Sequence, residues 1–171
     1  CAEILEDLGF DLIDLNCGCP VDKITKDGSG SGLLKTPKLI GQIISSIVKR
    51  VSVPVTVKIR AGWDDTDIVA PLITRIAEDA GASAIIIHGR TRKQAYKGLA
   101  NRDHIKESKK CAKNIKVFGN GDIFSAEDAK HMFDYTGCDG VFVARGTFGQ
   151  PWIAEDIRRM QENLPPLNRD F

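Results

Sequence analysis

The sequence predicts an α/β fold built from repeated strand–helix units. Three segments, 6–18, 78–90 and 134–146, share one pattern: an acidic helix end, a glycine, a short turn, a mostly apolar run and a polar loop that contains glycine. The apolar runs do not alternate with polar residues, which is typical of strands buried on both faces of a parallel sheet. Units of this kind build either a doubly wound sheet or a (β/α)8 barrel.

Five strands are expected in the chain. The apolar runs of the three segments supply three of them, and residues 54–60 and 114–122 supply two more. Gly9, Gly81 and Gly137 stand where the helix before a strand should end in the left-handed conformation. A complete (β/α)8 barrel needs about 250 residues. In a barrel, five strands in 171 residues would therefore be the last five of eight.

Helices are expected between the strands. Thr36 and Pro37 are typical of an N-cap and a first helical residue, and they begin a helix that should run to about Arg50. Its apolar residues follow the three–four spacing of one buried face. They are Leu39, Ile40, Ile43, Ile44, Ile47 and Val48. A second helix should run to about Ala80, with Pro71 tolerated only in its first turn.

Two more helices are expected in the last third of the chain. Ser125 and Asp128 resemble a capping box, with Asp in place of the usual Glu, and should begin the third helix. A fourth helix follows Pro151 and ends near residues 164–168, LPPLN. We interpret residues 163–171 as a linker that leaves the domain formed by residues 1–162.

Composition and cysteine content narrow the class of protein. No apolar run approaches the roughly 20 residues that span a bilayer, so no membrane segment is expected. The five cysteines are odd in number and scattered, unlike a disulfide scaffold, and this favours a reducing, cytoplasmic compartment. The net charge of +1 indicates no particular partner, because a stand-alone RNA-binding domain is usually more basic.

Polar side chains follow the apolar run of each predicted strand. Because the carboxyl ends of parallel strands meet at one edge of the sheet, these side chains should lie close together. They lie in residues 16–20, 58–60, 88–90, 120–122 and 144–146. The last two loops are rich in glycine, and in barrels such loops commonly hold a phosphate. Backbone N–H groups beside Gly121 and Gly146 can approach a phosphate, and Arg145 can neutralise it.

Cys17 and Cys19 have several interpretations. A metal site would need a second pair of Cys or His ligands nearby, so the C-x-C spacing predicts no metal. A disulfide across one residue would be strained. Two alternatives are left for Cys19: an inert small residue, or a catalytic thiol. A thiol is mostly protonated at pH 7 and can then donate a proton to a substrate.

Five blocks of sequence resemble one known family. The blocks NCGCP, VKIRAGW, IHGRT, FGNGDI and ARGTFGQPW, in this order and spacing, closely resemble the tRNA-dihydrouridine synthase family, from about Asp11 to Trp152. The resemblance implies an FMN-dependent (β/α)8 barrel that reduces the C5=C6 bond of particular uridines in tRNA, with NADPH as the electron source. It also implies a C-terminal helical domain that helps to hold tRNA, toward which the linker at 163–171 would lead.

The resemblance also implies a role for individual residues. Cys19 matches the catalytic cysteine, a general acid that protonates C5 of the uracil. The residues that match cofactor contacts are Lys58, His88, Asn120, Gly121, Asp122, Ala144 and Arg145. Asn16 and Arg60 match residues that face the substrate uridine. Many family members have Gly where this chain has Ala144, and Cys17 is not part of the shared pattern.

Two other functions stay open. One is an FMN barrel that reduces a free pyrimidine, as dihydroorotate and dihydropyrimidine dehydrogenases do, although the GCP and HGRT blocks favour the tRNA enzymes. The other is a non-catalytic RNA-binding fragment. A barrel that lacks three strands exposes sheet edges and part of its core. We therefore expect the 171 residues alone to be unstable or inactive and to hold FMN weakly.

Overall fold

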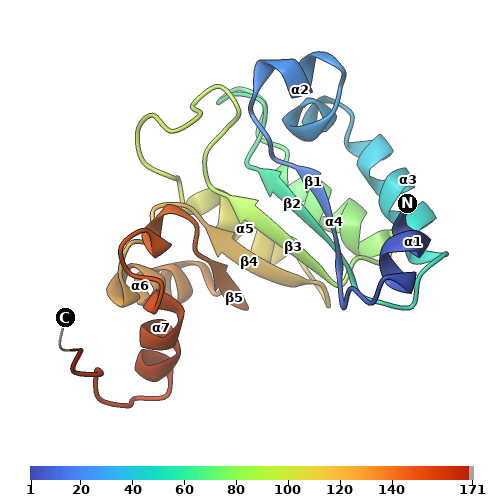
Figure 1. The fold of residues 1–171 in the computed structure, drawn as a ribbon. Helices are drawn as coiled ribbons and strands as arrows, with labels where there is room; N and C mark the ends of the chain where they lie inside the picture. The colour runs from blue at the N-terminus through green and yellow to red at the C-terminus, as the bar shows by residue number, and fades with distance from the viewer. Residues whose placement is uncertain (170–171) are drawn as a thin grey trace.

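The computed structural model describes residues 1–169 and contains one parallel sheet of five strands (Figure 1). The strands are β1 (Ile13–Cys17), β2 (Val55–Arg60), β3 (Ala84–His88), β4 (Lys116–Asn120) and β5 (Gly140–Phe142). They lie side by side in chain order. A doubly wound sheet reverses its strand order at a switch point, whereas a barrel does not. The strand order therefore favours the barrel over the doubly wound sheet.

Helices connect the strands and cover one face of the sheet. The helices are α1 (Ala2–Asp7), α2 (Asp22–Lys26), α3 (Pro37–Val48), α4 (Ala70–Asp79), α5 (Asp103–Cys111), α6 (Ala126–Thr136) and α7 (Ile153–Gln161). Short 3-10 helices occupy η1 (Gly30–Lys35) and η2 (Arg145–Thr147). Figure 1 shows α3 to α6 along the same face, so the opposite face of the sheet is left open.

The hydrophobic core lies between the sheet and these helices. Alternate residues of the strands, among them Ile59, Ile85 and Ile87, are fully buried in one cluster with Ile40 and Ile44 of α3 and apolar residues of the other helices. Burying apolar surface in this layer is the main force that holds the units together. The intervening strand residues point to the open face, and this face carries the polar side chains.

The ends of the helices follow the sequence prediction. Gly9, Gly81 and Gly137 have φ of +85°, +91° and +68°. Such φ values cost a residue with a side chain about 1 to 2 kcal/mol. At the start of α6 the Ser125 hydroxyl accepts a hydrogen bond from the backbone N–H of Asp128, 3.0 Å away. The Asp128 carboxylate accepts from the N–H of Phe124, one residue before the position that a standard capping box uses.

Two details differ from the sequence prediction. Leu39 is 42% exposed, because it lies beside Ile43 along a groove between α3 and α1 and not against the sheet. In β1, Asp14 and Asn16 are exposed on the open face, so this strand alternates and is buried on one face only. The expected burial on both faces holds best for β3, the central strand, whose residues are all buried.

The last described segment packs back onto α7. Arg169 forms an ion pair with Asp156, 2.5 Å away, and the Arg159 side chain donates a hydrogen bond to the carbonyl of Pro165. Positions 170 and 171 of the predicted linker lie outside the described residues. Within residues 1–169, no helix has both the length and the apolar character that a membrane span requires.

Candidate active site

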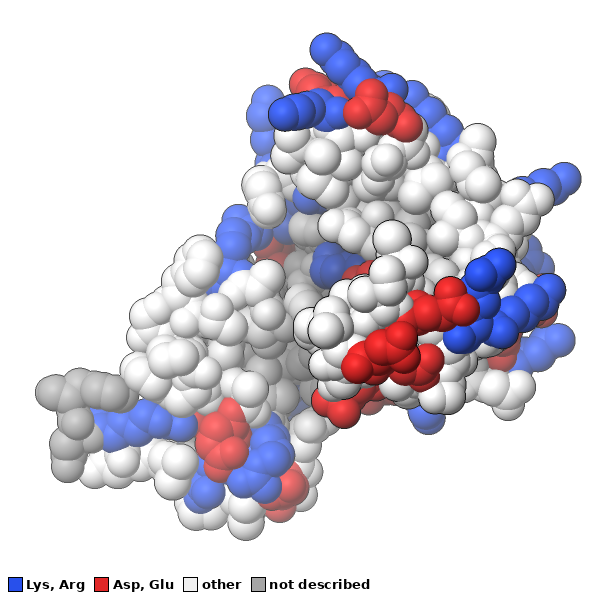
Figure 2. Space-filling model, turned by 45° about the vertical axis from the view of Figure 1, so that its right-hand side comes forward, with Lys and Arg blue, Asp and Glu red and all other residues white. Residues whose placement is uncertain are grey.

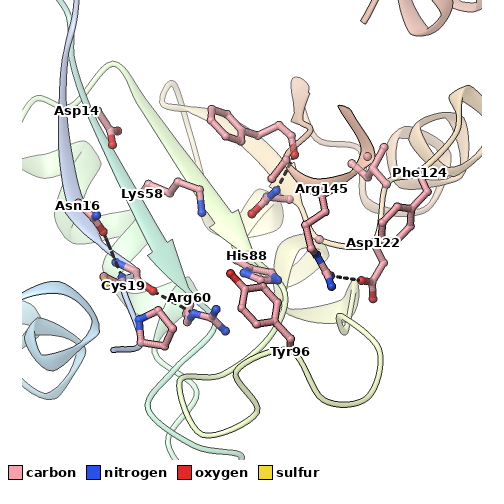
Figure 3. Close-up of a pocket in the computed structure, with 18 residues that line it drawn as sticks. Asp14, Asn16, Cys19, Lys58, Arg60, His88, Tyr96, Asp122, Phe124 and Arg145 are labelled. Atoms are coloured by element: carbon pink, nitrogen blue, oxygen red, sulfur yellow. Dashed lines mark hydrogen bonds and ion pairs between the residues drawn. The ribbon is translucent and has the colours of Figure 1, made fainter. Parts of the chain in front are cut away.

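A single pocket of about 360 Å³ opens at the carboxyl ends of the strands (Figure 3). Its lining includes every residue that the sequence singled out for a site. These are Asn16, Cys19, Lys58, Arg60, His88, Asn120, Gly121, Asp122, Ala144 and Arg145. The expectation that these side chains meet is confirmed, because register aligns the strand ends: Arg60 pairs with His88, and His88 with Asn120. Their chemical roles stay predictions.

The thiol of Cys19 is presented by a tightly bonded turn. The side-chain oxygen of Asn16 accepts hydrogen bonds from the backbone N–H groups of Gly18, at 3.0 Å, and Cys19, at 3.2 Å. The carbonyl of Cys19 accepts from both the N–H and the hydroxyl of buried Ser31, at 3.0 and 2.8 Å. These four bonds hold the half-buried, unpaired thiol at the pocket. The amide nitrogen of Asn16 has no partner within the described part of the chain.

Arg60 joins the end of β2 to the loops that follow β1 and β3. Its side chain is almost fully buried, at 3% exposure, and it donates to the carbonyls of Gly18, Thr91 and Ala95 over 2.9 to 3.0 Å. Burial is the main reason why the pKa of this guanidinium is lowered. Its Nε and Nη1 atoms donate to backbone carbonyls. Within residues 1–169, Nη2 is therefore the side-chain nitrogen of Arg60 that lacks a hydrogen-bond partner.

Lys58 lies on the open face of β2, and its ammonium has no hydrogen-bond acceptor among residues 1–169. Its ammonium makes no hydrogen bond or ion pair with the residues that the structure describes, and it lies 5.8 Å from the ring centre of Phe142. Burial, and then the charge of Arg60, lowers the pKa of Lys58, while the carboxylate of Asp14 opposes this shift. A half-buried lysine without a partner is rare in proteins and points to an electron-rich ligand.

His88 is held neutral. Burial, and then the charges of three neighbouring cations, lowers its pKa to about 3. The cations are Arg60, Lys58 and Arg90, and the carboxylate of Asp122 acts in the opposite direction. The imidazole is 8% exposed and forms one wall of the pocket. It therefore acts near pH 7 as a neutral ring with one N–H donor and one acceptor.

The glycine-rich end of the pocket is shaped for an anion. Gly121 has a φ of +117°, and a Cβ there would lie 2.7 Å from the Cβ of Ala100 and 2.9 Å from Cδ2 of His88. A Cβ at Gly146 would lie 2.1 Å from the carbonyl oxygen of Ile123. Only glycine fits at either position, and both glycines are closely packed, buried residues that border the pocket. Backbone N–H groups of this kind, with the Arg145 guanidinium beside them, suit a phosphate.

Asn120 and Arg145 are fixed by their neighbours at this end of the pocket. The amide nitrogen of Asn120 donates to the carbonyl of Phe142 over 2.6 Å and so joins β4 to β5. The Arg145 guanidinium lies 3.2 Å from the Asp122 carboxylate, 4.8 Å from the ring centre of Tyr96 and 5.5 Å from that of Phe124. Arg145 is thus a partly exposed cation in contact with two aromatic rings.

Five lining residues were not identified from the sequence: Asp14, Tyr96, Ile123, Phe124 and Phe142. Asp14 could have been found, because it stands two residues before Asn16 on β1 and therefore shares its face. Tyr96 and Phe124 lie in loops, where no periodicity marks them. Within residues 1–169, no three His, Cys, Asp or Glu side chains are grouped as a metal site would require.

The outer surface lacks a continuous basic patch on the side shown in Figure 2. Acidic and basic side chains are intermixed there. Some Lys and Arg atoms lie in the recess beside the part of the molecule that carries the C-terminal end. The pocket itself contains Lys58, Arg60 and Arg145, against Asp14 and Asp122. The pocket thus holds one more cation than carboxylate.

Solved structures share this fold at low sequence identity. A phosphonopyruvate hydrolase in complex with oxalate and Mg²⁺ superposes with a TM-score of 0.62 at 16% identity, covering 97% of this chain and 60% of that one. A protein described as a phosphonomutase, from Burkholderia cenocepacia J2315, gives a TM-score of 0.63 at 18% identity, covering 83% and 64%. At this identity the likeness supports the fold alone.

Curated relatives are much more similar in sequence. The chain is 45% identical over 152 residues to tRNA-dihydrouridine synthase B of Pasteurella multocida (strain Pm70), which is 89% of this chain and 46% of that protein. It is 44% identical over 155 residues to tRNA-dihydrouridine synthase B of Vibrio vulnificus (strain CMCP6), which is 91% of this chain and 48% of that protein. The chain thus spans about half the length of the curated relatives it matches.

A family model described as "Dihydrouridine synthase (Dus)" matches residues 1–168, nearly the whole chain. This match agrees with the five parallel strands in barrel order and with the resemblance of the five sequence blocks. The five strand–helix units are part of the (β/α)8 barrel of the family that matches, and the chain belongs to the dihydrouridine synthase family.

Proposed function

We propose that the protein carrying this chain reduces specific uridines of tRNA to 5,6-dihydrouridine in the cytoplasm, with FMN as cofactor and NADPH as electron source. The observation that carries the proposal is the gathering of all ten predicted site residues, from the ends of five strands, around one pocket. Its relatives are named for this activity on tRNA. The pocket supplies a thiol, a neutral imidazole and an unsatisfied lysine side by side.

The residues of the pocket fit FMN. The backbone of the lining residues Gly121 and Gly146, with the cation of Arg145, suits its phosphate. Asn120, Asp122 and Ala144 border the same end and would line the ribityl chain. Lys58 and His88 lie on the wall between this end and Cys19, where the ring system would lie. When bound, FMN supplies the hydride that goes to C6 of the uracil.

Cys19 would supply the proton. Hydride addition at C6 leaves C5 in need of a proton, and a neutral thiol can deliver it as a general acid. A general acid must carry its proton and be held close to C5. A nucleophilic cysteine, in contrast, reacts as the thiolate. Four hydrogen bonds fix its turn, two accepted by the Asn16 side chain and two donated by Ser31, and they support such a positioned donor. Fixed donors lose little entropy in the reaction.

Asn16 and Arg60 would contact the uracil through the atoms that the protein leaves unused. The Asn16 oxygen is occupied by two backbone N–H groups, so its amide nitrogen is free to donate. The Nη2 atom of Arg60 is likewise free to donate, since Nε and Nη1 bond to backbone carbonyls. Both atoms can only donate, and the substrate edge offers the O2 and O4 carbonyl acceptors.

The test is a reaction of the purified intact protein with unmodified tRNA and NADPH, followed by mass spectrometry of the nucleosides. We expect a bound flavin in the absorption spectrum and dihydrouridine at particular positions. Reduction of free uracil, uridine or orotate in preference to tRNA would instead establish the free-pyrimidine enzyme. Binding of tRNA by a protein that takes up no flavin would establish a non-catalytic RNA-binding role and contradict the proposal.

A further inference from the structure

Arg90 lies behind the pocket and bonds to several of its parts at once. The side chain follows β3 by two residues and is 3% exposed. Its Nη2 atom donates to the carbonyl of Gly98 over 2.6 Å and to the carboxylate of Asp122 over 2.7 Å. Its Nη1 atom lies 3.4 Å from Nε2 of His88, and its Nε atom lies 3.4 Å from the carbonyl of Lys97.

Both carboxylate oxygens of Asp122 accept hydrogen bonds in the same network. Oδ2 accepts from Arg90 and from the backbone N–H of Ala100, at 2.7 and 2.8 Å, while Oδ1 accepts from Arg145 at 3.2 Å. Its φ of +50° is in the left-handed region, which a residue with a side chain seldom adopts. The ion pair with buried Arg90 therefore holds the turn at 120–122 in a conformation that its own backbone disfavours.

The contact to His88 determines where the proton of the imidazole lies. A guanidinium carries donors only, so the ring nitrogen that faces it must present a lone pair. A neutral imidazole with its lone pair on Nε2 has its proton on Nδ1. Nδ1 has no partner within the residues that the structure describes. The Nδ1–H group is therefore left to a ligand in the pocket.

We propose that Arg90 is a positioning residue: it fixes His88 as the Nδ1–H tautomer and, through Asp122, fixes the anion-binding turn at 120–122. The second half of this inference depends on the proposed function, because it assigns that turn to FMN. The first half does not, because it concerns only the protein. An arginine that merely filled space in the core would leave the imidazole tautomer unaffected.

Four charged groups face His88 and affect the pH at which its imidazole titrates. Arg90 and Asp122 approach from the loops after β3 and β4, and Arg60 and Lys58 approach from β2. The three cations disfavour a second proton on the ring, and the carboxylate favours it. Removing Arg90 takes away one cation and leaves the carboxylate less neutralised. Both changes act in the same direction and make His88 easier to protonate.

The experiment is ¹⁵N NMR of the intact protein labelled at histidine, without FMN. The chain has three histidines, and His88→Gln identifies the signals of His88. In the unsubstituted protein near pH 7 we expect the proton on Nδ1 and a lone pair on Nε2. In Arg90→Gln we expect a mixture of tautomers and a titration midpoint that moves to higher pH, and Arg90→Lys should restore part of the effect. Arg75→Gln, on the exposed face of α4, is the matched control.

Flavin affinity provides the second readout. We expect Arg90→Gln to weaken FMN binding at least tenfold, equivalent to about 1.4 kcal/mol, with Arg75→Gln unchanged. A proton on Nε2 in the unsubstituted protein, or a tautomer that Arg90→Gln leaves unchanged, would overturn the inference. If Arg90→Gln does not fold, the tautomer of the unsubstituted protein and the Arg90→Lys variant still decide it. An Nδ1–H tautomer in a protein that forms no dihydrouridine would overturn the proposed function while leaving the pairing of Arg90 with His88 in place.

Discussion

Cys17 and Cys19 are two residues apart, yet Cys17 is buried in the hydrophobic core and Cys19 lines the pocket. Cys17 is the last residue of β1, where its side chain packs among core residues at 0% exposure, and burial raises the pKa of its thiol to about 12. After Cys17 the chain leaves the strand in the turn that Asn16 bonds. That turn delivers the second thiol to the polar side of the sheet.

Lys58→Met is expected to impair flavin function while leaving the fold intact. The ammonium makes no hydrogen bond or ion pair within the described part of the protein, and burial lowers its pKa. The substitution therefore removes a charge that costs free energy to bury, and it leaves no protein group without a hydrogen-bond partner. We expect equal or higher thermal stability and flavin reduction by NADPH slowed at least tenfold, as measured by stopped-flow absorbance. Lys113→Met, at an exposed position, is the matched control. Flavin reduction at the unsubstituted rate would contradict the role of Lys58.

His88 should make stability fall as pH falls. Its pKa is about 3 in the folded protein, against a reference value of 6.5, so the unfolded chain binds a proton first. Between these values the free energy of unfolding falls, by about 2 kcal/mol from neutral pH to pH 5, since each pKa unit is equivalent to about 1.4 kcal/mol. Urea unfolding at several pH values should show a weaker loss of stability for His88→Gln than for the unsubstituted protein. Parallel curves for the two proteins would show that His88 titrates normally.

Gly121→Ala is expected to disrupt the anion-binding end of the pocket. The added methyl would meet Ala100 and His88 at less than 3 Å, and φ of +117° is unfavourable for alanine. Overpacking and backbone strain together should cost more than about 2 kcal/mol and should abolish FMN retention on gel filtration. In Gly137→Ala the φ is +68° and the methyl would meet nothing within 4 Å. That control isolates the strain, about 1 to 2 kcal/mol, and should keep its flavin.

The 171 residues on their own should bind FMN far more weakly than the intact protein. β1 and β5 each pair with one neighbour only, and the open face of the sheet exposes the polar side of the pocket. Unpaired strand edges also favour association with other chains. Titration of FMN by fluorescence quenching, together with size-exclusion chromatography, compares the two forms. Equal affinity in both would show that these five strand–helix units hold the cofactor unaided.

The grouping of the candidate site residues is predictable from the sequence because they stand at or near the ends of strands. A parallel sheet brings such ends together without further information, which is why the sequence alone predicts that Cys19, Lys58, His88 and Arg145 lie near one another. The five strands and most helix ends follow from equally local signals, such as the glycines at positive φ.

What could not be predicted depends on contacts between loops. Tyr96 reaches the pocket because Arg60 and Arg90 bond to carbonyls of the loop that carries it. No periodic pattern in the sequence encodes those bonds. The use of the Asn16 oxygen to build the Cys19 turn is likewise a property of the folded backbone. Leu39 is exposed although its spacing predicts a core position, because helical spacing does not tell which neighbour an apolar face will meet.

The most direct test of the account is dihydrouridine formation by Cys19→Ala, measured by mass spectrometry of tRNA after reaction with NADPH. Cys17→Ala is the matched control, because it removes a thiol from the core two residues away. We predict that Cys19→Ala keeps its flavin and lets NADPH reduce it, yet loses at least a hundredfold in dihydrouridine formation, while Cys17→Ala stays active. Full dihydrouridine formation by Cys19→Ala would contradict the assignment of this thiol as the proton donor.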